Sequence, residues 1–296
     1  MIARSAKVGK PLVLAGLVMF LSGLATLPAE ADPAMWVVKD PDSTIYLLGT
    51  IHVMKPDADW RTPKLEEALK ASAEYWMEAD ISEDAAIAQT YILNFGFDHE
   101  HPLAEKLKAA DYAKLIAVAK SFDLPADKFA DMRPWFADMA LTQAQVKSLG
   151  YDPEQGVDIT LEREAKAAGK PVKTFETATE QLGFISGLPE KAAAEMLVQD
   201  INNLDKGNKQ VDAMMAAWQA GDVKALQKVG FDDVRTDAPG YYEIMIVKRN
   251  KAWVKTIESM LQGSGTAFIA VGCGHLIGPD SVPAQLKAAG YRVERY

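Results

Sequence analysis

Apolar runs short enough to be strands occur toward both ends of the chain, and helical periodicity occupies the middle. Residues 36–38 and 44–48 are largely β-branched, aromatic or aliphatic and flank a cluster of turn formers, which predicts a β-hairpin. Residues 63–72 predict a helix with Thr62 as its N-cap and a proline at its first position. The apolar centre of residues 74–78 predicts a strand buried on both faces.

The middle of the chain, from about residue 82 to 235, is rich in alanine, lysine and glutamate at helical spacing. Prolines divide this stretch, which predicts a large helical insertion rather than one long helix. One βα-type unit is expected inside it: a helix at 157–168, Gly169 as the residue that ends the helix, and a strand at 171–175.

The final third returns to alternating elements, with a helix expected at 241–261, a strand at 266–271, a helix at 282–289 and a strand at 291–295. The pattern therefore predicts an α/β fold. We expect a mixed, mostly parallel central sheet built from the N- and C-terminal segments, with the helical insertion between them.

Residues 1–31 have the three parts of a secretory signal peptide: a positively charged start, an apolar stretch at 12–27, and the small residues Ala29 and Ala31. Cleavage after Ala31 would leave residues 32–296 as a single domain in the periplasm or outside the cell. An uncleaved membrane anchor would place the same domain outside the cytoplasm. No second apolar stretch long enough to span a membrane is expected after the signal.

Composition narrows the class of partner. The net charge is −9, and losing the basic signal makes the remainder more acidic, so nucleic acid is not expected as a partner. The single Cys273 cannot form an internal disulfide, and the exported fold must depend on its hydrophobic core.

Two identical tetrapeptide patterns follow predicted strands. Gly49-Thr50-Ile51-His52 comes after the strand at 44–48, and Gly272-Cys273-Gly274-His275 after the strand at 266–271. Glycine at a strand exit permits a tight turn, with a positive φ if needed, that aims the histidine back over the sheet. One Gly-x-x-His is a weak motif, but two among only four histidines indicate a shared functional site.

Two glutamates, Glu78 and Glu176, also end predicted strands. Because the carboxyl ends of parallel strands meet at one edge, these carboxylates and the two histidines are expected in one cleft. Asp80 is a weaker candidate. The pair His99 and His101 lies in a loop beside a proline and is interpreted as surface.

Two other features are interpreted structurally. Cys273 is expected to be a small buried residue, because His275 is too close in sequence to take its proton readily. Met214, Met215 and Trp218 lie at helical spacing and are expected in the core, although an exposed groove there could bind peptides.

The sequence resembles the TraB/GumN family, whose animal members include the Tiki metalloproteases that act on Wnt. The segments that carry the resemblance span nearly the whole mature chain: residues 46–52, Glu78, residues 156–158, residues 174–177 with Gln181, Arg249-Asn250 before Trp253, residues 270–276, and the closing residues 278–293. Cys273 stands where a small unreactive residue is expected.

The resemblance implies a fold shared with erythromycin esterase-like and haem-binding ChaN-like proteins. It also implies an active site of two Gly-x-x-His histidines and a glutamate, here His52, His275 and Glu78, and, in the Tiki branch, peptide cleavage that depends on a divalent metal. Two imidazoles and a carboxylate suit such a metal (Zn, Mn or Co), which would lower the pKa of bound water. A metal-free site with a histidine as general base, oriented by a glutamate, would suffice for esters.

Arg249 is a candidate to stabilise an oxyanion or hold a substrate carboxylate, although Lys248, Lys251 and Lys255 nearby favour a solvated basic face. The expected function is an exported metal-dependent hydrolase acting on peptides or on small esters or amides. Two rivals stay open: a haem- or iron-binding protein with Tyr241 or Tyr242 as axial ligand, and a non-catalytic protein in conjugation, signalling or polysaccharide export.

Overall fold

The computed structural model describes residues 32–80 and 84–296; the proposed signal peptide, residues 1–31, lies outside the described residues. The strands are β1 (Met35–Lys39), β2 (Ser43–Thr50), β3 (Glu74–Met77), β4 (Val172–Thr174), β5 (Gly265–Gly272) and β6 (Val293–Arg295). They form one sheet in the order β4-β3-β5-β2-β1-β6. The β2–β5, β5–β3 and β3–β4 pairs are parallel, and β1 pairs antiparallel with both β2 and β6.

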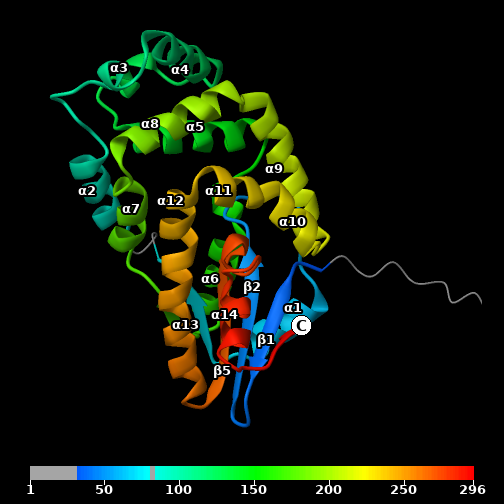
Figure 1. Cartoon of the computed structure of the whole chain (residues 1–296). Helices are drawn as coiled ribbons and strands as arrows, with labels where there is room; N and C mark the ends of the chain where they lie inside the picture. The colour runs from blue at the N-terminus through cyan, green and yellow to red at the C-terminus, as the bar shows by residue number, and fades with distance from the viewer. Residues whose placement is uncertain (1–31, 81–83) are drawn as a thin grey trace, which may run out of the picture. The chain divides into compact units, whose positions relative to one another are not determined.

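Some of the helices lie beside this sheet, and others are grouped beyond one end of it (Figure 1). Before β4 they are α1 (Pro63–Ala71), α2 (Ala85–Phe95), α3 (Leu103–Lys106), α4 (Ala109–Ser121), η1 (Ala126–Phe129), α5 (Pro134–Ser148), η2 (Pro153–Gln155) and α6 (Val157–Ala167). After it come α7 (Ala178–Ser186), α8 (Glu190–Asn202), α9 (Leu204–Gln219), α10 (Val223–Gly230), α11 (Asp232–Asp237), α12 (Pro239–Tyr242), η3 (Glu243–Val247), α13 (Lys248–Leu261), η4 (Cys273–His275) and α14 (Val282–Ala288).

The α/β class, the central sheet from both ends of the chain and the helical insertion are as the sequence predicts. Thr62 caps α1 by accepting a hydrogen bond from the Leu65 N–H. Gly169 has φ of +70° and follows α6, as expected of a residue that ends a helix. The strand expected to be buried on both faces is buried on one, because the side chains of Glu74 and Trp76 are only partly covered.

The long helix expected at 241–261 is interrupted. Its first part is α12, followed by the π-helical turn η3, and only α13 is regular α-helix. A π turn widens the helix by one residue and changes the direction of the side chains that follow. Arg249 and Asn250 lie at the start of α13, directly after this turn.

Two large hydrophobic clusters hold the fold together, besides a small one of Tyr242, Ile246 and Val247. The larger covers both faces of the sheet, with Leu47 and Phe268 from the strands and Leu161, Trp218 and Trp253 from the helices. A separate cluster lies among α3, α4, α5 and α8, which Figure 1 shows grouped away from the sheet. Met215 and Trp218 are core residues, as expected, and the Trp218 indole N–H donates to the Gly49 carbonyl at 2.7 Å.

None of the helices in residues 32–80 and 84–296 has the length and apolar character that crossing a bilayer requires.

Candidate active site

Four neighbouring strand ends bring the candidate residues together. His52 follows β2, His275 lies in η4 after β5, Glu78 follows β3, and Glu176 comes two residues after β4. These four strands are adjacent and parallel in the sheet, so their carboxyl ends share one edge.

Glu78 is the centre of the site. Its Oε1 lies 3.9 Å from His52 Nε2 and 3.7 Å from His275 Nε2, and it accepts the Gly272 N–H at 2.7 Å. Its Oε2 accepts from Arg249 Nη2 at 2.6 Å and from Gln181 Nε2 at 2.9 Å. The side chain is 8% exposed, so the carboxylate is buried with a full set of donors.

His52 is held by Asp158, the second residue of α6. Asp158 Oδ2 lies 3.0 Å from His52 Nδ1 and accepts a hydrogen bond from the Nδ1–H, which leaves Nε2 directed toward Glu78. The Tyr75 hydroxyl donates to the Asp158 carbonyl and anchors this turn. Asp158 Oδ1 is buried with no hydrogen-bond partner among the described residues. Unlike the other members of the site, the His52 side chain is 58% exposed.

His275 is held by Asn250. The Asn250 amide nitrogen donates to the carbonyls of His275 and Asp280, so its Oδ1 is the acceptor for His275 Nδ1–H at 2.7 Å. His275 Nε2 must then accept, and Arg249 Nη1 donates to it at 3.1 Å. The Trp253 ring covers the imidazole with its centroid 4.2 Å away.

Arg249 is buried, which corrects the interpretation that favoured a solvated basic face. Its guanidinium bridges Glu78 and Glu176, with Nε and Nη2 both donating to the Glu176 carboxylate. The Trp253 indole also donates to Glu176 Oε1 at 2.9 Å. Lys248, Lys251 and Lys255 are exposed, as expected for the outer face of the helix.

The first glycine of each tetrapeptide is required by the space around it and not by its backbone conformation, because neither Gly49 nor Gly272 has a positive φ. A Cβ on Gly272 would lie 3.0 Å from Glu78 Oε1 and 3.1 Å from His52 Nε2. A Cβ on Gly49 would lie 3.1 Å from Cys273. Each glycine therefore lets one histidine-bearing turn approach the other, rather than supplying an unusual backbone conformation.

The environments separate the pKa values of the three central groups. The Asp158 carboxylate, opposed by burial and assisted by Glu78, raises the pKa of His52 to about 9. Burial lowers the pKa of His275 to about 3, so this imidazole is neutral. Burial alone would raise the pKa of Glu78, but His275, His52, Arg249 and the Gly272 N–H outweigh it and lower that pKa to about 2. With His275 neutral, the positive charges that keep Glu78 ionised near pH 7 are those of His52 and Arg249.

The remaining candidates lie elsewhere or are inert. The Asp80 carboxylate pairs with Lys166 at 2.8 Å, away from Glu78's donors. His99 and His101 are exposed, as expected of a surface loop. Cys273 is buried, and burial raises the pKa of its thiol to about 12, which disfavours a thiolate nucleophile.

The two tyrosines considered as haem ligands, Tyr241 and Tyr242, lie in α12. The Tyr242 hydroxyl donates to Asp280 Oδ2 at 3.2 Å, and burial raises its pKa to about 12. Burial also raises the pKa of Tyr241.

Asp158, Asn250 and Gln181 have direct contacts that the sequence reasoning left without a role. All three stand in the segments that carry the family resemblance, but only as part of longer matches. Their signal was thus visible in the sequence, whereas their partners, His52, His275 and Glu78, are 25 to 106 residues away along the chain.

The TraB/PrgY/gumN family model matches residues 34–295, nearly all of the described chain. The chain belongs to the TraB/PrgY/gumN family. Among relatives, "Uncharacterized protein YbaP" of Escherichia coli (strain K12) is 25% identical over 260 residues, covering 86% of this chain and 92% of that protein.

Two more distant relatives have named activities. "Metalloprotease TIKI1" of Danio rerio is 24% identical over 327 residues, covering 92% of this chain and 65% of that protein. "Metalloprotease TIKI2" of the same organism is 24% identical over 321 residues, covering 90% and 61%. No solved structure gives a significant match.

The donor types suit a divalent metal, but the side chains are not arranged around one. Both imidazoles have Nδ1 tied to an oxygen acceptor and Nε2 facing Glu78 Oε1, which is how metal-binding histidines are oriented. However, within residues 32–80 and 84–296 no group of three His, Cys, Asp or Glu side chains is placed to hold a metal ion. Arg249, against both His275 Nε2 and Glu78 Oε2, is the cation already present.

Proposed function

We propose that this protein is an exported hydrolase of peptide bonds, with its active site at His52, Glu78, His275 and Arg249. One observation carries the proposal: a single carboxylate oxygen of Glu78 faces the Nε2 atoms of two histidines within 4 Å. The distant likeness to Tiki metalloproteases supports peptides over esters as the substrate class.

The likeness to the Tiki metalloproteases suggests a divalent metal, which His52, Glu78 and His275 would hold only after rearrangement. When bound, such a metal activates water and polarises a carbonyl. Metal binding would require the Arg249 guanidinium to move away from His275 Nε2, and it would require the His52 imidazole to lose its positive charge. Asp158 and Asn250 would fix the two imidazoles from behind.

A metal-free version is favoured by a different observation, the separation of pKa values. Two groups whose pKa values are pushed apart suit acid and base roles, and at neutral pH Glu78 is an ionised acceptor while His52 is a protonated donor. Glu78 would accept a proton from the water that attacks the carbonyl carbon. His52 would protonate the leaving amine as the C–N bond breaks, and Arg249 would compensate the charge on the oxyanion.

The deciding variant is Glu78→Gln, measured for both metal content and peptide hydrolysis. If Glu78 is a ligand, metal and activity fall together; if it is a base, metal content stays while hydrolysis falls at least about 100-fold. Full metal content with full turnover would remove Glu78 from the site. A second variant, His52→Ala, tests the role of the exposed histidine and should also lose hydrolysis. His99→Ala is its matched control, because His99 makes the same Nδ1–carboxylate contact, with Asp131 at 2.9 Å, on the surface.

A further inference from the structure

The sheet ends at β4, a strand of three residues whose outer edge is paired with no other strand of residues 32–80 and 84–296. On the inner side, the Tyr75 N–H donates to the Pro171 carbonyl and the Phe175 N–H to the Met77 carbonyl. In a parallel ladder this register directs the Lys173 N–H and C=O toward β3. The N–H and C=O groups of Val172 and Thr174 therefore point outward, away from the sheet.

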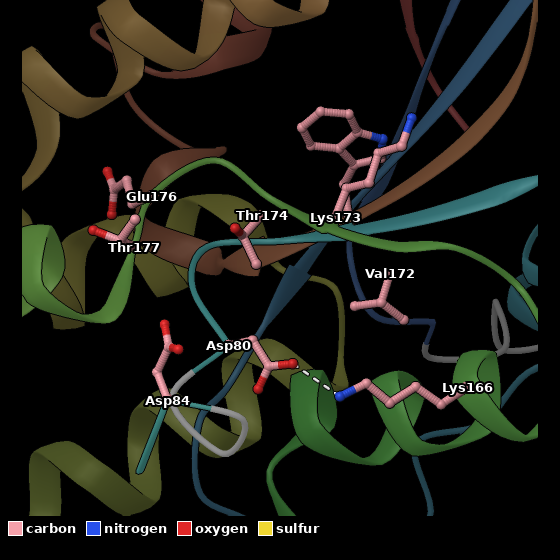
Figure 2. A pocket seen from close by; sticks show the side chains of 9 residues that line it. Asp80, Asp84, Lys166, Val172, Lys173, Thr174, Glu176 and Thr177 are labelled. Atoms are coloured by element: carbon pink, nitrogen blue, oxygen red, sulfur yellow. Dashed lines mark hydrogen bonds and ion pairs between the residues drawn. The ribbon is translucent and has the colours of Figure 1, made fainter. Parts of the chain in front are cut away.

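A pocket of about 580 Å³ lies along this outer edge (Figure 2). Val172, Lys173 and Thr174, the whole of β4, line it. Its walls come from both sides of the sheet, because Lys173 and Trp76 share one face, with the Lys173 ammonium 5.3 Å from the Trp76 ring centre. On the other face Figure 2 shows Val172 and Thr174 on the side of Asp80 and Lys166. The pocket thus wraps around the strand's free edge.

The pocket reaches one residue of the candidate active site, Glu176. Glu176 and Thr177 line its far end, and Glu176 is the residue whose carboxylate binds Arg249 and Trp253. β3 and β5 are the next strands inward, and they carry Glu78 and His275. With strands about 4.8 Å apart, a chain beside β4 would be roughly 14 Å from the end of β5, a distance that about four extended residues span.

The chemistry of this pocket selects a ligand with an extended backbone. Outward N–H and C=O groups at alternate residues match those of a peptide strand, which adds to a sheet edge by main-chain hydrogen bonds. The side walls are mixed in charge, because Lys166 and Lys173 line the pocket together with Asp80, Asp84 and Glu176. Such walls do not demand a charged ligand and tolerate varied side chains.

We propose that polypeptide substrates bind as an additional strand along β4 and reach the catalytic residues over its carboxyl end. This inference rests on the proposed peptidase function and deepens it, because it makes extended polypeptides, rather than dipeptides or compact small amides, the substrate class. The segment of the substrate between its contact with β4 and the bond to be cleaved is then about four residues long.

Thr174→Pro tests the proposal, since proline deletes one outward N–H and leaves the β3–β4 hydrogen bonds intact. Thr174→Val is the matched control, because it removes the hydroxyl and keeps the N–H. In wild type we expect kcat/KM to rise as peptides are lengthened to about four residues on one side of the cleaved bond and then to level off. Thr174→Pro should lower the ratio of kcat/KM for long over short peptides at least 10-fold, mainly through KM, and Thr174→Val should not.

Binding separates this proposal from the proposed function. A fluorescein-labelled octapeptide of alternating valine and serine is titrated by anisotropy into Glu78→Gln protein and into Glu78→Gln combined with each Thr174 variant. Two results support the β4 site even if wild type hydrolyses nothing. The Thr174→Pro protein, and not the Thr174→Val protein, should bind the peptide more weakly than the Glu78→Gln protein, and the peptide N-methylated at alternate residues should bind more weakly than the unmodified peptide. Equal binding by all variants, or no binding, overturns it. Circular dichroism and Tm confirm that the proline variant is folded.

Discussion

At the residue scale, the two histidines of this site are alike in sequence and opposite in state. Both belong to Gly-x-x-His turns and both have Nδ1 bonded to an oxygen. His52 is exposed and faces a carboxylate, whereas His275 is buried and faces a neutral amide and a guanidinium. The His52 imidazole therefore carries a positive charge near neutral pH, and the His275 imidazole is neutral.

Asp158→Asn should remove the charge that distinguishes His52. Because that carboxylate is the main reason for the raised pKa, we expect the pKa of His52 to fall from about 9 toward its ordinary 6.5. The imidazole would also lose its fixed orientation, so activity should fall about 10–100-fold. Histidine NMR titration and peptide hydrolysis measure the two effects. Asp131→Asn, beside His99, is the matched control, and an unchanged His52 titration would contradict the prediction.

At the scale of elements, the π turn η3 and helix α13 act together to place Arg249. The guanidinium donates to the Met245 carbonyl inside η3 at 3.2 Å, and Asn250, the next residue, holds His275. A regular α-helix through this segment would rotate both side chains by the equivalent of one residue. The irregular turn is thus part of how two adjacent residues reach two different partners.

Helices α5 and α8 bring two carboxyl groups together, Asp138 from α5 and Asp200 from α8. Burial, together with Asp200, raises the pKa of Asp138 to about 8, and its Oδ1 has no hydrogen-bond partner among the described residues. A group whose folded-state pKa is raised stabilises the fold fully below its unfolded pKa. That contribution is lost as pH rises from about 4 through about 8.

Asp138→Asn should therefore stabilise the protein at pH 8 and change little at pH 4, because the amide stays neutral throughout. A gain of roughly 1 kcal/mol would raise Tm by about 2–4 °C at pH 8. Thermal unfolding at several pH values checks this, with the exposed Asp59→Asn as a control of equal charge change. An unchanged slope of Tm against pH would show that Asp138 ionises without cost.

At the scale of the whole molecule, the sheet order assembles the site from segments that are distant in sequence. β2 and β5 are direct neighbours, with Thr50 opposite Gly272, although more than half of the chain lies between them. The helical insertion leaves the sheet after β3 and returns to it at β4 and then β5. Unfolding of the sheet would therefore separate all four candidate catalytic residues at once.

Export is a prediction for the whole chain. If residues 1–31 are a signal peptide, mass spectrometry of the periplasmic protein should find Asp32 as its first residue. The Ala31→Arg variant, which places a bulky charge at the cleavage position, should accumulate the uncleaved form. Recovery of wild type only as a full-length, membrane-bound species would contradict the prediction.

The sequence by itself determined the α/β class, the helical insertion and the positions of His52, Glu78 and His275 after the ends of strands. These features depend on local periodicity and turn chemistry. It did not determine the burial of Arg249, which lies between Lys248 and Lys251 in the sequence, nor the π turn before it. Only the tertiary structure placed Asp158 behind His52, Asn250 behind His275 and Glu176 against Arg249. Such contacts join groups far apart along the chain, and their charges and pKa values depend on distance and burial in three dimensions.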